Sequence, residues 1–270
     1  MEPVHVTVWE ETDGTGVPAV FVHNILTWGS DAEYGFAAQR PLAARRQLLL
    51  MDRRGYGGSP DTERADFDVD ADDVIGLLGD GAHLVGHGYG GVVAMLAAAR
   101  RPDLVRSLAL IQPAAFDAAR EHPAVAPILQ RLARVASEPA PEAVSPAQFL
   151  RESTAGVGLP VPEATPERLR AVATSMAERP VFEARVDLAP IAGAPWPSLV
   201  VCGTWQDAPA LYRELVGEPL IACAETVAAA IGAELLRVPG YYPHTQQAAA
   251  VNAALQELWE SRESQDSSKC

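Results

Sequence analysis

The chain has 270 residues, of which 48% are hydrophobic and 21% are charged, and its formal net charge is −14. This length and composition allow one large globular domain with a sizeable core, or a domain with an insertion. The acidic charge argues against nucleic acid and anionic membranes as partners. No apolar stretch of the sequence approaches the roughly 20 residues needed to span a bilayer.

Targeting signals and cofactor anchors are also missing from the sequence. The first residues, MEPVHVTVWEETDG, carry neither a basic segment nor the apolar run of a secretion signal, so we expect a cytoplasmic protein. The three cysteines, Cys202, Cys223 and Cys270, are far apart and lack metal-ligand spacing. The single lysine, Lys269, lies in a polar tail, which excludes a buried Schiff-base or P-loop lysine. We therefore expect no cofactor and no metal.

Short apolar runs alternate with helical patterns along the chain. Runs that predict strands cover residues 5–11, 19–24, 48–53, 82–88, 105–113, 198–203 and 234–240. The first run alternates apolar and polar residues as an edge strand does, and most others are continuously apolar, like parallel strands buried on both faces. Helical patterns lie at about 69–79, 90–100, 221–232 and 246–260. This alternation predicts an α/β fold, with helices on both faces of a sheet that is parallel apart from its N-terminal edge.

Residues 116–195 interrupt the alternation. They are rich in Pro, Ala and Glu, and they contain two helical stretches, APILQRLARVA and PERLRAVATSMAE, but no clear strand. A segment of about 80 residues is too long for a plain loop. We predict a helical cap over the carboxyl ends of the strands, where open α/β sheets bind their ligands. The predicted core is 1–115 and 196–260, and we expect residues 261–270 to form a disordered tail.

The stretch LVGHGYGG, residues 84–91, allows two interpretations. Its glycines fit G-x-G-x-x-G, the pattern of a dinucleotide-binding loop. Such a loop normally follows the first strand, and an acidic residue ends the next strand. Here at least three predicted strands come before the motif, and the next strand ends in LIQPAAF without an acid. The second interpretation is the nucleophile elbow, G-x-S-x-G, a tight turn from a strand into a helix.

The wider sequence resembles the α/β-hydrolase family from about residue 4 to residue 260. VFVHN (20–24) is similar to the strand end that supplies one oxyanion amide, and MDRRGYGGS (51–59) to a D-x-R-G-x-G-x-S loop. LVGHGYGG is similar to the elbow, PSLVVCGTWQD (197–207) to the strand that carries the acid, and VPGYYPHTQQAAAVNAAL (238–255) to the final G-H-x-P loop and helix. The resemblance implies an α/β-hydrolase fold with a nucleophile, an acid and a histidine in that order.

The departures from the family pattern fall on the catalytic positions. The nucleophile position holds Gly88, and the histidine position holds Tyr241. The acid position falls on Gln206, with Asp207 one residue later. Because a serine and its histidine work as one unit, we expect no ordinary serine hydrolysis. Gly88 could be natural or an introduced change, although the tyrosine at 241 argues against a single introduced mutation.

The turn can persist without its nucleophile, because glycine accepts positive φ without strain. The N–H of Tyr89 and an N–H just after His23 could then still form an oxyanion hole, worth roughly 3 kcal/mol for each donor. Tyr241 could donate a hydrogen bond to a substrate oxygen, or fill the space of the missing histidine. The candidate catalytic residues are therefore Gly88, Tyr89, His23, Asp207 and Tyr241.

Further residues near the strand ends are candidates for ligand binding. The set comprises Asn24, Trp28, Phe116, Trp205, Gln206, Tyr242 and His244. The alternative for the aromatic residues is that they belong to the core. His244 could replace the missing histidine, pack in the core or face solvent.

The sequence leaves three functions open. The first is a non-hydrolytic, nucleophile-free catalyst, such as a lyase, isomerase or cyclase, that acts on a small apolar carbonyl-containing metabolite, for example in natural-product biosynthesis. The second is a non-catalytic protein that binds a small molecule. The third is a hydrolase whose serine was replaced by Gly88. The expected partner is a small molecule rather than nucleic acid or a membrane, and the oligomeric state is open.

Overall fold

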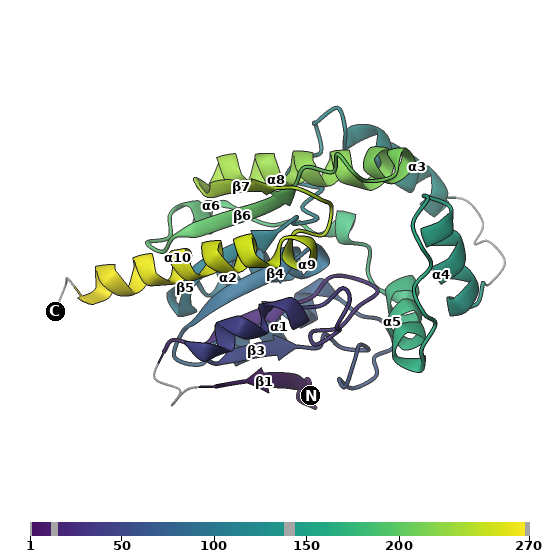
Figure 1. Cartoon of the computed structure of the whole chain (residues 1–270). Coiled ribbons are helices and arrows are strands. Elements are labelled where there is room, and N and C mark those ends of the chain that lie inside the picture. Colours follow the sequence, from purple (N-terminus) through teal and green to yellow (C-terminus); the bar gives the residue numbers. More distant parts are fainter. Residues whose placement is uncertain (1, 12–15, 138–143, 268–270) are drawn as a thin grey trace.

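The computed structural model describes residues 2–11, 16–137 and 144–267. Seven strands form one sheet in the order β1-β3-β2-β4-β5-β6-β7, and only the pair β1 and β3 is antiparallel. The prediction of an α/β fold with a mainly parallel sheet is confirmed (Figure 1). The strands are β1 (Val6–Trp9), β2 (Ala19–Val22), β3 (Leu48–Met51), β4 (Ala82–His87), β5 (Val105–Ile111), β6 (Ser198–Gly203) and β7 (Glu234–Val238).

The central strands are buried on both faces, which explains their continuous apolar sequence. In β2, Val20 and Val22 belong to one buried cluster, whereas Ala19 and Phe21 belong to another. The first cluster includes residues of the helices α1 (Phe67–Leu77), α2 (Tyr89–Arg100) and α8 (Glu218–Ile231). The second includes residues of the 3-10 helix η1 (Ala37–Ala44) and of α10 (Ala248–Ser267).

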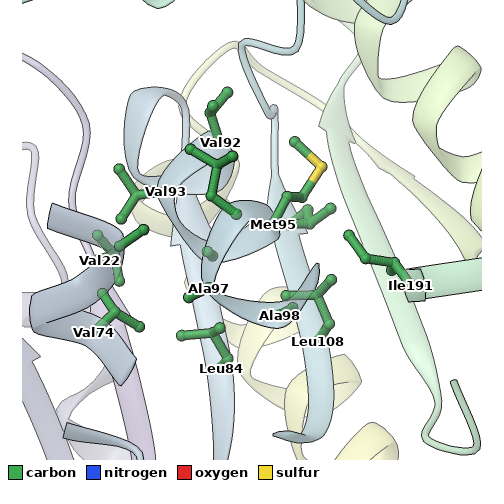
Figure 2. Packing of buried hydrophobic residues seen from close by; sticks show 14 of the residues in the cluster. Val22, Val74, Leu84, Val92, Val93, Met95, Ala97, Ala98, Leu108 and Ile191 are labelled. Carbon is green, nitrogen blue, oxygen red and sulfur yellow. The ribbon is translucent and has the colours of Figure 1, made fainter. Parts of the chain in front are cut away.

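Helix α2 packs tightly on the middle of the sheet. Its side chains, among them Val92, Val93 and Met95, lie against strand residues such as Leu84 and Leu108 (Figure 2). Helix α2 directly follows β4, and one residue, Gly88, separates the two elements. The position of this turn is therefore fixed by the core on both sides.

The chain between β5 and β6 forms helices and, within its described residues, no strand. These helices are α3 (Ala126–Ser137), α4 (Pro146–Ala155), α5 (Pro166–Ala177), η3 (Val181–Glu183) and α6 (Ala189–Ala192). Helices α3, α4 and α5 lie together at one end of the sheet (Figure 1). Helix α5 contacts the loops after β2 and β3, because the Ser175 hydroxyl accepts from the Leu26 N–H and the Thr174 hydroxyl donates to the Gly55 carbonyl. The division into a core and a cap at residues 116 and 195 stays a prediction.

The remaining elements are short, apart from the last helix. They are η2 (Pro102–Leu104), α7 (Ala210–Tyr212), the π-helical turn η4 (Arg213–Gly217) and α9 (Pro243–Gln246). Helix α10 extends to Ser267, within the segment 261–270 for which the sequence predicted a tail, and residues 268–270 lie outside the described residues. No helix in the described part of the chain is long and apolar enough to span a membrane.

The close approach of α2 to the sheet gives a first prediction. A Cβ added to Gly90 would overlap with the Val22 carbonyl oxygen and lie 2.5 Å from that of His23. We therefore expect Gly90→Ala to lower the free energy of unfolding by at least about 2 kcal/mol, as overpacking does. Gly76→Ala in α1 is the control, since a Cβ there meets nothing within 4 Å; it should raise stability by about 0.5–1 kcal/mol. Urea unfolding measures both, and equal effects would contradict the prediction.

Candidate functional site

The turn between β4 and α2 has the geometry of a nucleophile elbow. Gly88 has φ 55° and ψ −114°, a backbone conformation that residues other than glycine rarely adopt. Its N–H donates to the Ile111 carbonyl at 3.0 Å, and its carbonyl accepts from the Ala114 N–H at 3.1 Å. Hydrogen bonds from the last residue of β5 and from the loop after it therefore hold the turn beside the end of that strand.

The side chain of Asn24 occupies the place where a nucleophile would project. A Cβ added to Gly88 would overlap with the Asn24 carboxamide and lie 2.7 Å from its Nδ2. Asn24 Oδ1 accepts a hydrogen bond from the Tyr89 N–H at 2.9 Å. The amide predicted to form an oxyanion hole is therefore already bonded within the protein. Asn24 Nδ2 donates no hydrogen bond among the described residues, so it is the free donor at this point.

His23 is fully buried and both of its ring nitrogens are used. Its Nε2 accepts from the Arg53 N–H at 3.0 Å, so the proton is on Nδ1, which donates to the Asn24 carbonyl at 2.6 Å. Burial and the nearby Arg53 charge lower the pKa of His23 well below its usual value. His23 is therefore neutral and joins the loops after β2 and β3, and no proton on it is free for a substrate.

Tyr241 follows β7 and lies in a cluster of aromatic rings. Its ring centroid is 5.9 Å from those of Trp205 and Tyr212, and 4.9 Å from that of Tyr242. Gln246 Oε1 accepts the N–H groups of Tyr241 and Tyr242 at 2.7 and 2.8 Å, which fixes the backbone of this loop. The half-buried Tyr241 makes no hydrogen bond through its hydroxyl within the described residues. That hydroxyl is therefore available to a ligand.

The two candidates for the acid position have side chains that are exposed to solvent. Gln206 and Asp207 are both exposed, in the loop after β6. Neither side chain has a hydrogen bond or ion pair to Tyr241 in the described structure. Their neighbour Trp205 is buried instead, and its Nε1–H donates to Gln112 Oε1 at 2.8 Å. The structure thus brings Trp205, and not the carboxylate, to the tyrosine loop.

His244 lies in the core behind the elbow. Its ring centroid is 4.3 Å from that of His87 and 5.6 Å from that of Phe36, and its Nε2–H donates to the Tyr34 carbonyl at 3.2 Å. Burial lowers the pKa of His244 to about 4 and that of His87 well below its usual value. Both imidazoles are therefore neutral near pH 7.

The other predicted aromatic residues lie in separate places. Phe116 packs with Ala119 and Val125 in a small cluster beside α8. Trp28 lies beneath the Arg168 guanidinium, with 5.0 Å between the guanidinium carbon and the ring centroid. Tyr242 joins the aromatic cluster, and its hydroxyl lies 3.1 Å from that of Tyr212.

A buried cluster of charged residues, which was not predicted from the sequence, consists of Arg53, Asp70 and Glu178. The fully buried Arg53 Nη1 lies 3.1 Å from Asp70 Oδ2 and 3.1 Å from Glu178 Oε2. Burial raises the pKa of Asp70 to about 6 and also raises that of Glu178. The guanidinium lies over the Tyr89 ring at 4.1 Å, and Tyr89 donates its hydroxyl proton to the Arg179 carbonyl. Tyr89 therefore offers the site its backbone and not its hydroxyl.

Glu178 of this cluster and Arg168 anchor helix α5 to the core. Glu178 follows α5 and accepts from the Tyr56 hydroxyl at 2.8 Å. Arg168 of α5 pairs with Asp31 at 2.7 Å and donates to the Leu26 carbonyl at 2.6 Å. The helix is thus anchored near both of its ends by buried polar groups.

The elbow coincides neither with a group of metal ligands nor with the surface hollow near the N-terminal residue Glu2. The described residues contain no group of three or more His, Cys, Asp or Glu side chains that could hold a metal ion. A surface hollow of about 430 Å³ is lined by Glu2, Arg54, Pro60, Asp61, Thr62, Glu63, Arg64, Asp66 and Val69, and it contains none of the predicted site residues.

In the α/β hydrolases, a strand of the parallel sheet turns sharply into a buried helix, and the residue at the turn has positive φ. Strand β4, Gly88 and helix α2 have this arrangement. The model of the Alpha/beta hydrolase family matches residues 19–254. The chain therefore belongs to this family, as the order of its motifs indicated.

Curated relatives match a limited part of the chain. It is 36% identical over 106 residues to the pimeloyl-(acyl-carrier protein) methyl ester esterase of Chromobacterium violaceum, over 39% of this chain and 41% of that protein. It is 34% identical over 104 residues to the sn-1-specific diacylglycerol lipase ABHD11 of Mus musculus, over 37% of this chain and 33% of that protein. The chain thus spans less than half the length of these relatives, which are an esterase and a lipase.

Solved structures match nearly the whole chain. A thermophilic esterase from Thermogutta terrifontis has a TM-score of 0.61 at 22% identity, over 96% of this chain and 94% of that one. The enol-lactonase from Burkholderia xenovorans LB400 has a TM-score of 0.58 at 19% identity, over 94% and 95%. At these identities the likeness shows the fold alone.

The buried His244 predicts acid sensitivity. Its pKa falls from 6.5 to about 4 on folding. The stability that the neutral ring allows is present above pH 6.5 and lost as the pH falls toward 4, by up to about 3 kcal/mol at roughly 1.4 kcal/mol per pKa unit. His244→Gln keeps a donor for the Tyr34 carbonyl but does not titrate. In urea unfolding between about pH 7.5 and about pH 4.5, the wild type should lose more stability than the variant.

This comparison removes the opposite contribution of Asp70, whose raised pKa acts equally in both proteins. A difference between wild type and variant that does not change with pH would show that His244 is not buried in its neutral form.

Proposed function

We propose that this chain binds a small, mostly apolar, carbonyl-containing metabolite above Gly88. We also propose that it does not hydrolyse esters through a nucleophilic serine. The observation that carries the proposal is the position of the Asn24 carboxamide. It fills the space of the nucleophile and accepts the hydrogen bond of the Tyr89 N–H. An amide that is already bonded gives less stabilisation to a developing oxyanion, because the ligand must first displace Asn24.

The other catalytic positions support the same proposal. Hydrolysis through an acyl-enzyme needs a nucleophile next to a base that a third group orients. Gly88 supplies no nucleophile, the family's histidine position holds Tyr241, and both ring nitrogens of His23 are engaged in internal hydrogen bonds. The carboxylate next to the acid position, that of Asp207, is exposed and not buried beside the turn.

The donors that remain indicate the chemistry of the ligand. Asn24 Nδ2 and the Tyr241 hydroxyl both carry protons and make no internal hydrogen bond in the described structure. Two donors favour a ligand oxygen that accepts, such as a ketone, lactone or ester carbonyl. The partly exposed rings of Tyr241 and Tyr242 would offer it apolar surface. A polarised carbonyl of this kind also leaves room for lyase, isomerase or cyclase turnover, which needs no nucleophile on the protein.

Hydrolysis is the second candidate, and the curated relatives favour it. They are an esterase and a lipase, so the part of this chain that matches them is similar to segments of hydrolytic enzymes. A hydrolase of this chain would need an attacking water, since Gly88 cannot form a covalent intermediate. The two candidates differ in whether an ester is hydrolysed, which makes them separable by assay.

Binding of a ketone tests the first candidate. We expect 2-acetonaphthone to bind more tightly than 2-ethylnaphthalene, which has the same rings and no carbonyl, in calorimetric titration. Asn24→Asp keeps an oxygen for the Tyr89 N–H but removes the Nδ2 donor. It should weaken binding of the ketone by about fivefold or more, the factor for one hydrogen bond, and leave binding of the hydrocarbon nearly unchanged. Equal binding of the two ligands by the wild type would contradict the proposal.

Reaction with an ester tests the second candidate. We expect the wild type neither to hydrolyse p-nitrophenyl butyrate above background nor to gain mass from a fluorophosphonate. Gly88→Ser should also stay nearly inactive, because the position of the family's histidine holds Tyr241 and leaves the serine hydroxyl without its usual base. Turnover of the ester by the wild type would favour a water-based hydrolase, and a stoichiometric adduct would reveal a nucleophile outside the elbow.

A further inference from the structure

We propose that Gln112 is the positioning residue that holds Tyr241 and Trp205 at a fixed distance from Gly88. Gln112 is not among the residues that the sequence singled out. The inference rests on the proposed function for its effect on ligands, and on the geometry of three loops for the positioning itself.

The backbone of Gln112 is strained and lies directly beside the elbow. Its φ is 46°, in the left-handed region that residues other than glycine rarely occupy, and the residue is 2% exposed. Its N–H donates to the Val201 carbonyl at 2.8 Å, and the preceding Ile111 accepts the Gly88 N–H. Such strain persists only where the surroundings compensate for it, and it is concentrated at functional sites.

The side chain supplies that compensation through three hydrogen bonds. Gln112 Oε1 accepts the Gly203 N–H at 3.1 Å and the Trp205 Nε1–H at 2.8 Å. Gln112 Nε2 donates to the Tyr241 carbonyl at 3.1 Å. One carboxamide therefore joins the chain ends of β5, β6 and β7. A carboxylate could accept the two N–H groups but could not donate to Tyr241.

The loops that Gln112 joins also bond to each other. The Trp205 N–H donates to the Gly240 carbonyl at 3.0 Å, and the Thr204 N–H donates to the Val238 carbonyl at 2.8 Å. Trp205 itself has φ 59°, so a second strained residue lies in the same place. Because Gly88 is bonded to Ile111 on one side and Tyr241 to Gln112 on the other, the turn and the tyrosine loop are tied through two consecutive residues.

A double-mutant cycle on ligand binding tests whether Gln112 acts through Tyr241. With 2-acetonaphthone as the probe, Gln112→Met should raise Kd by about fivefold, the factor for one hydrogen bond. In a Tyr241→Phe background the same change should raise Kd by less than about twofold, because the hydroxyl that Gln112 positions is absent. Gln112→Glu should lie between wild type and Gln112→Met. An equal effect of Gln112→Met in both backgrounds would overturn the proposal.

A second measurement does not depend on any ligand. The six tyrosines of the chain can be replaced by 3-fluorotyrosine, and Tyr241→Phe assigns the fluorine resonance of residue 241. This resonance should shift or broaden in Gln112→Met and move less in Gln112→Glu. Gln39→Met is the control, since Gln39 is also fully buried and donates to a backbone carbonyl, that of His244. It should leave the Tyr241 resonance nearly unchanged.

The outcomes separate the two proposals. A wild type that ignores the ketone overturns the proposed ligand class, whereas the fluorine spectra still test Gln112. A Tyr241 resonance that is the same in Gln112→Met and wild type, or that Gln39→Met changes as much, overturns the positioning role. Urea unfolding of each variant confirms that the protein measured is folded.

Discussion

The approach of helix α2 to the sheet at Gly88 is the constraint on which the rest of the structure depends. A Cβ on Gly86 would lie 2.7 Å from the Gly91 Cα, so the backbones of strand and helix come into direct contact at this point. This contact leaves one residue for the turn and forces it into positive φ. It also brings the first amides of α2 beside the end of β2, which is why a residue of that strand end, Asn24, can reach them.

The contact between Asn24 and α2 follows from the needs of a helix end. The first N–H groups of a helix lack partners within it, and a side chain at the preceding residue usually supplies one. Gly88 has no side chain with which to do so. Asn24 Oδ1 supplies the acceptor from another strand, and the neutral His23 fixes its backbone through the Asn24 carbonyl. The group that completes the helix is therefore the group that closes the oxyanion position.

The sequence predicted the fold well because the fold depends on patterns that a sequence displays. An alternating run located the first strand, apolar runs located the other six, and GHGYGG located the turn. The site depends on side-chain directions, which a spacing does not contain. Asn24 was named as a binding residue, but nothing in VFVHN indicates that its carboxamide reaches Tyr89. The strain at Gln112 was equally hidden, since LIQP resembles any strand end, although its place at a carboxyl end was a usable signal.

The distribution of charge limits what the elbow can recognise. The chain is strongly acidic, but the groups around Gly88 carry little charge. His23 and His244 are neutral because their pKa values are lowered, and burial raises the pKa of Tyr89 and Tyr242, which keeps their hydroxyls protonated. The guanidinium of Arg53, which lies 3.5 Å from the Asn24 carbonyl, is paired with the buried carboxylates of Asp70 and Glu178. Without a net charge to attract an ion, the position of donors and apolar rings is left to decide which ligand binds, and that position is set by the loops after β2, β5, β6 and β7.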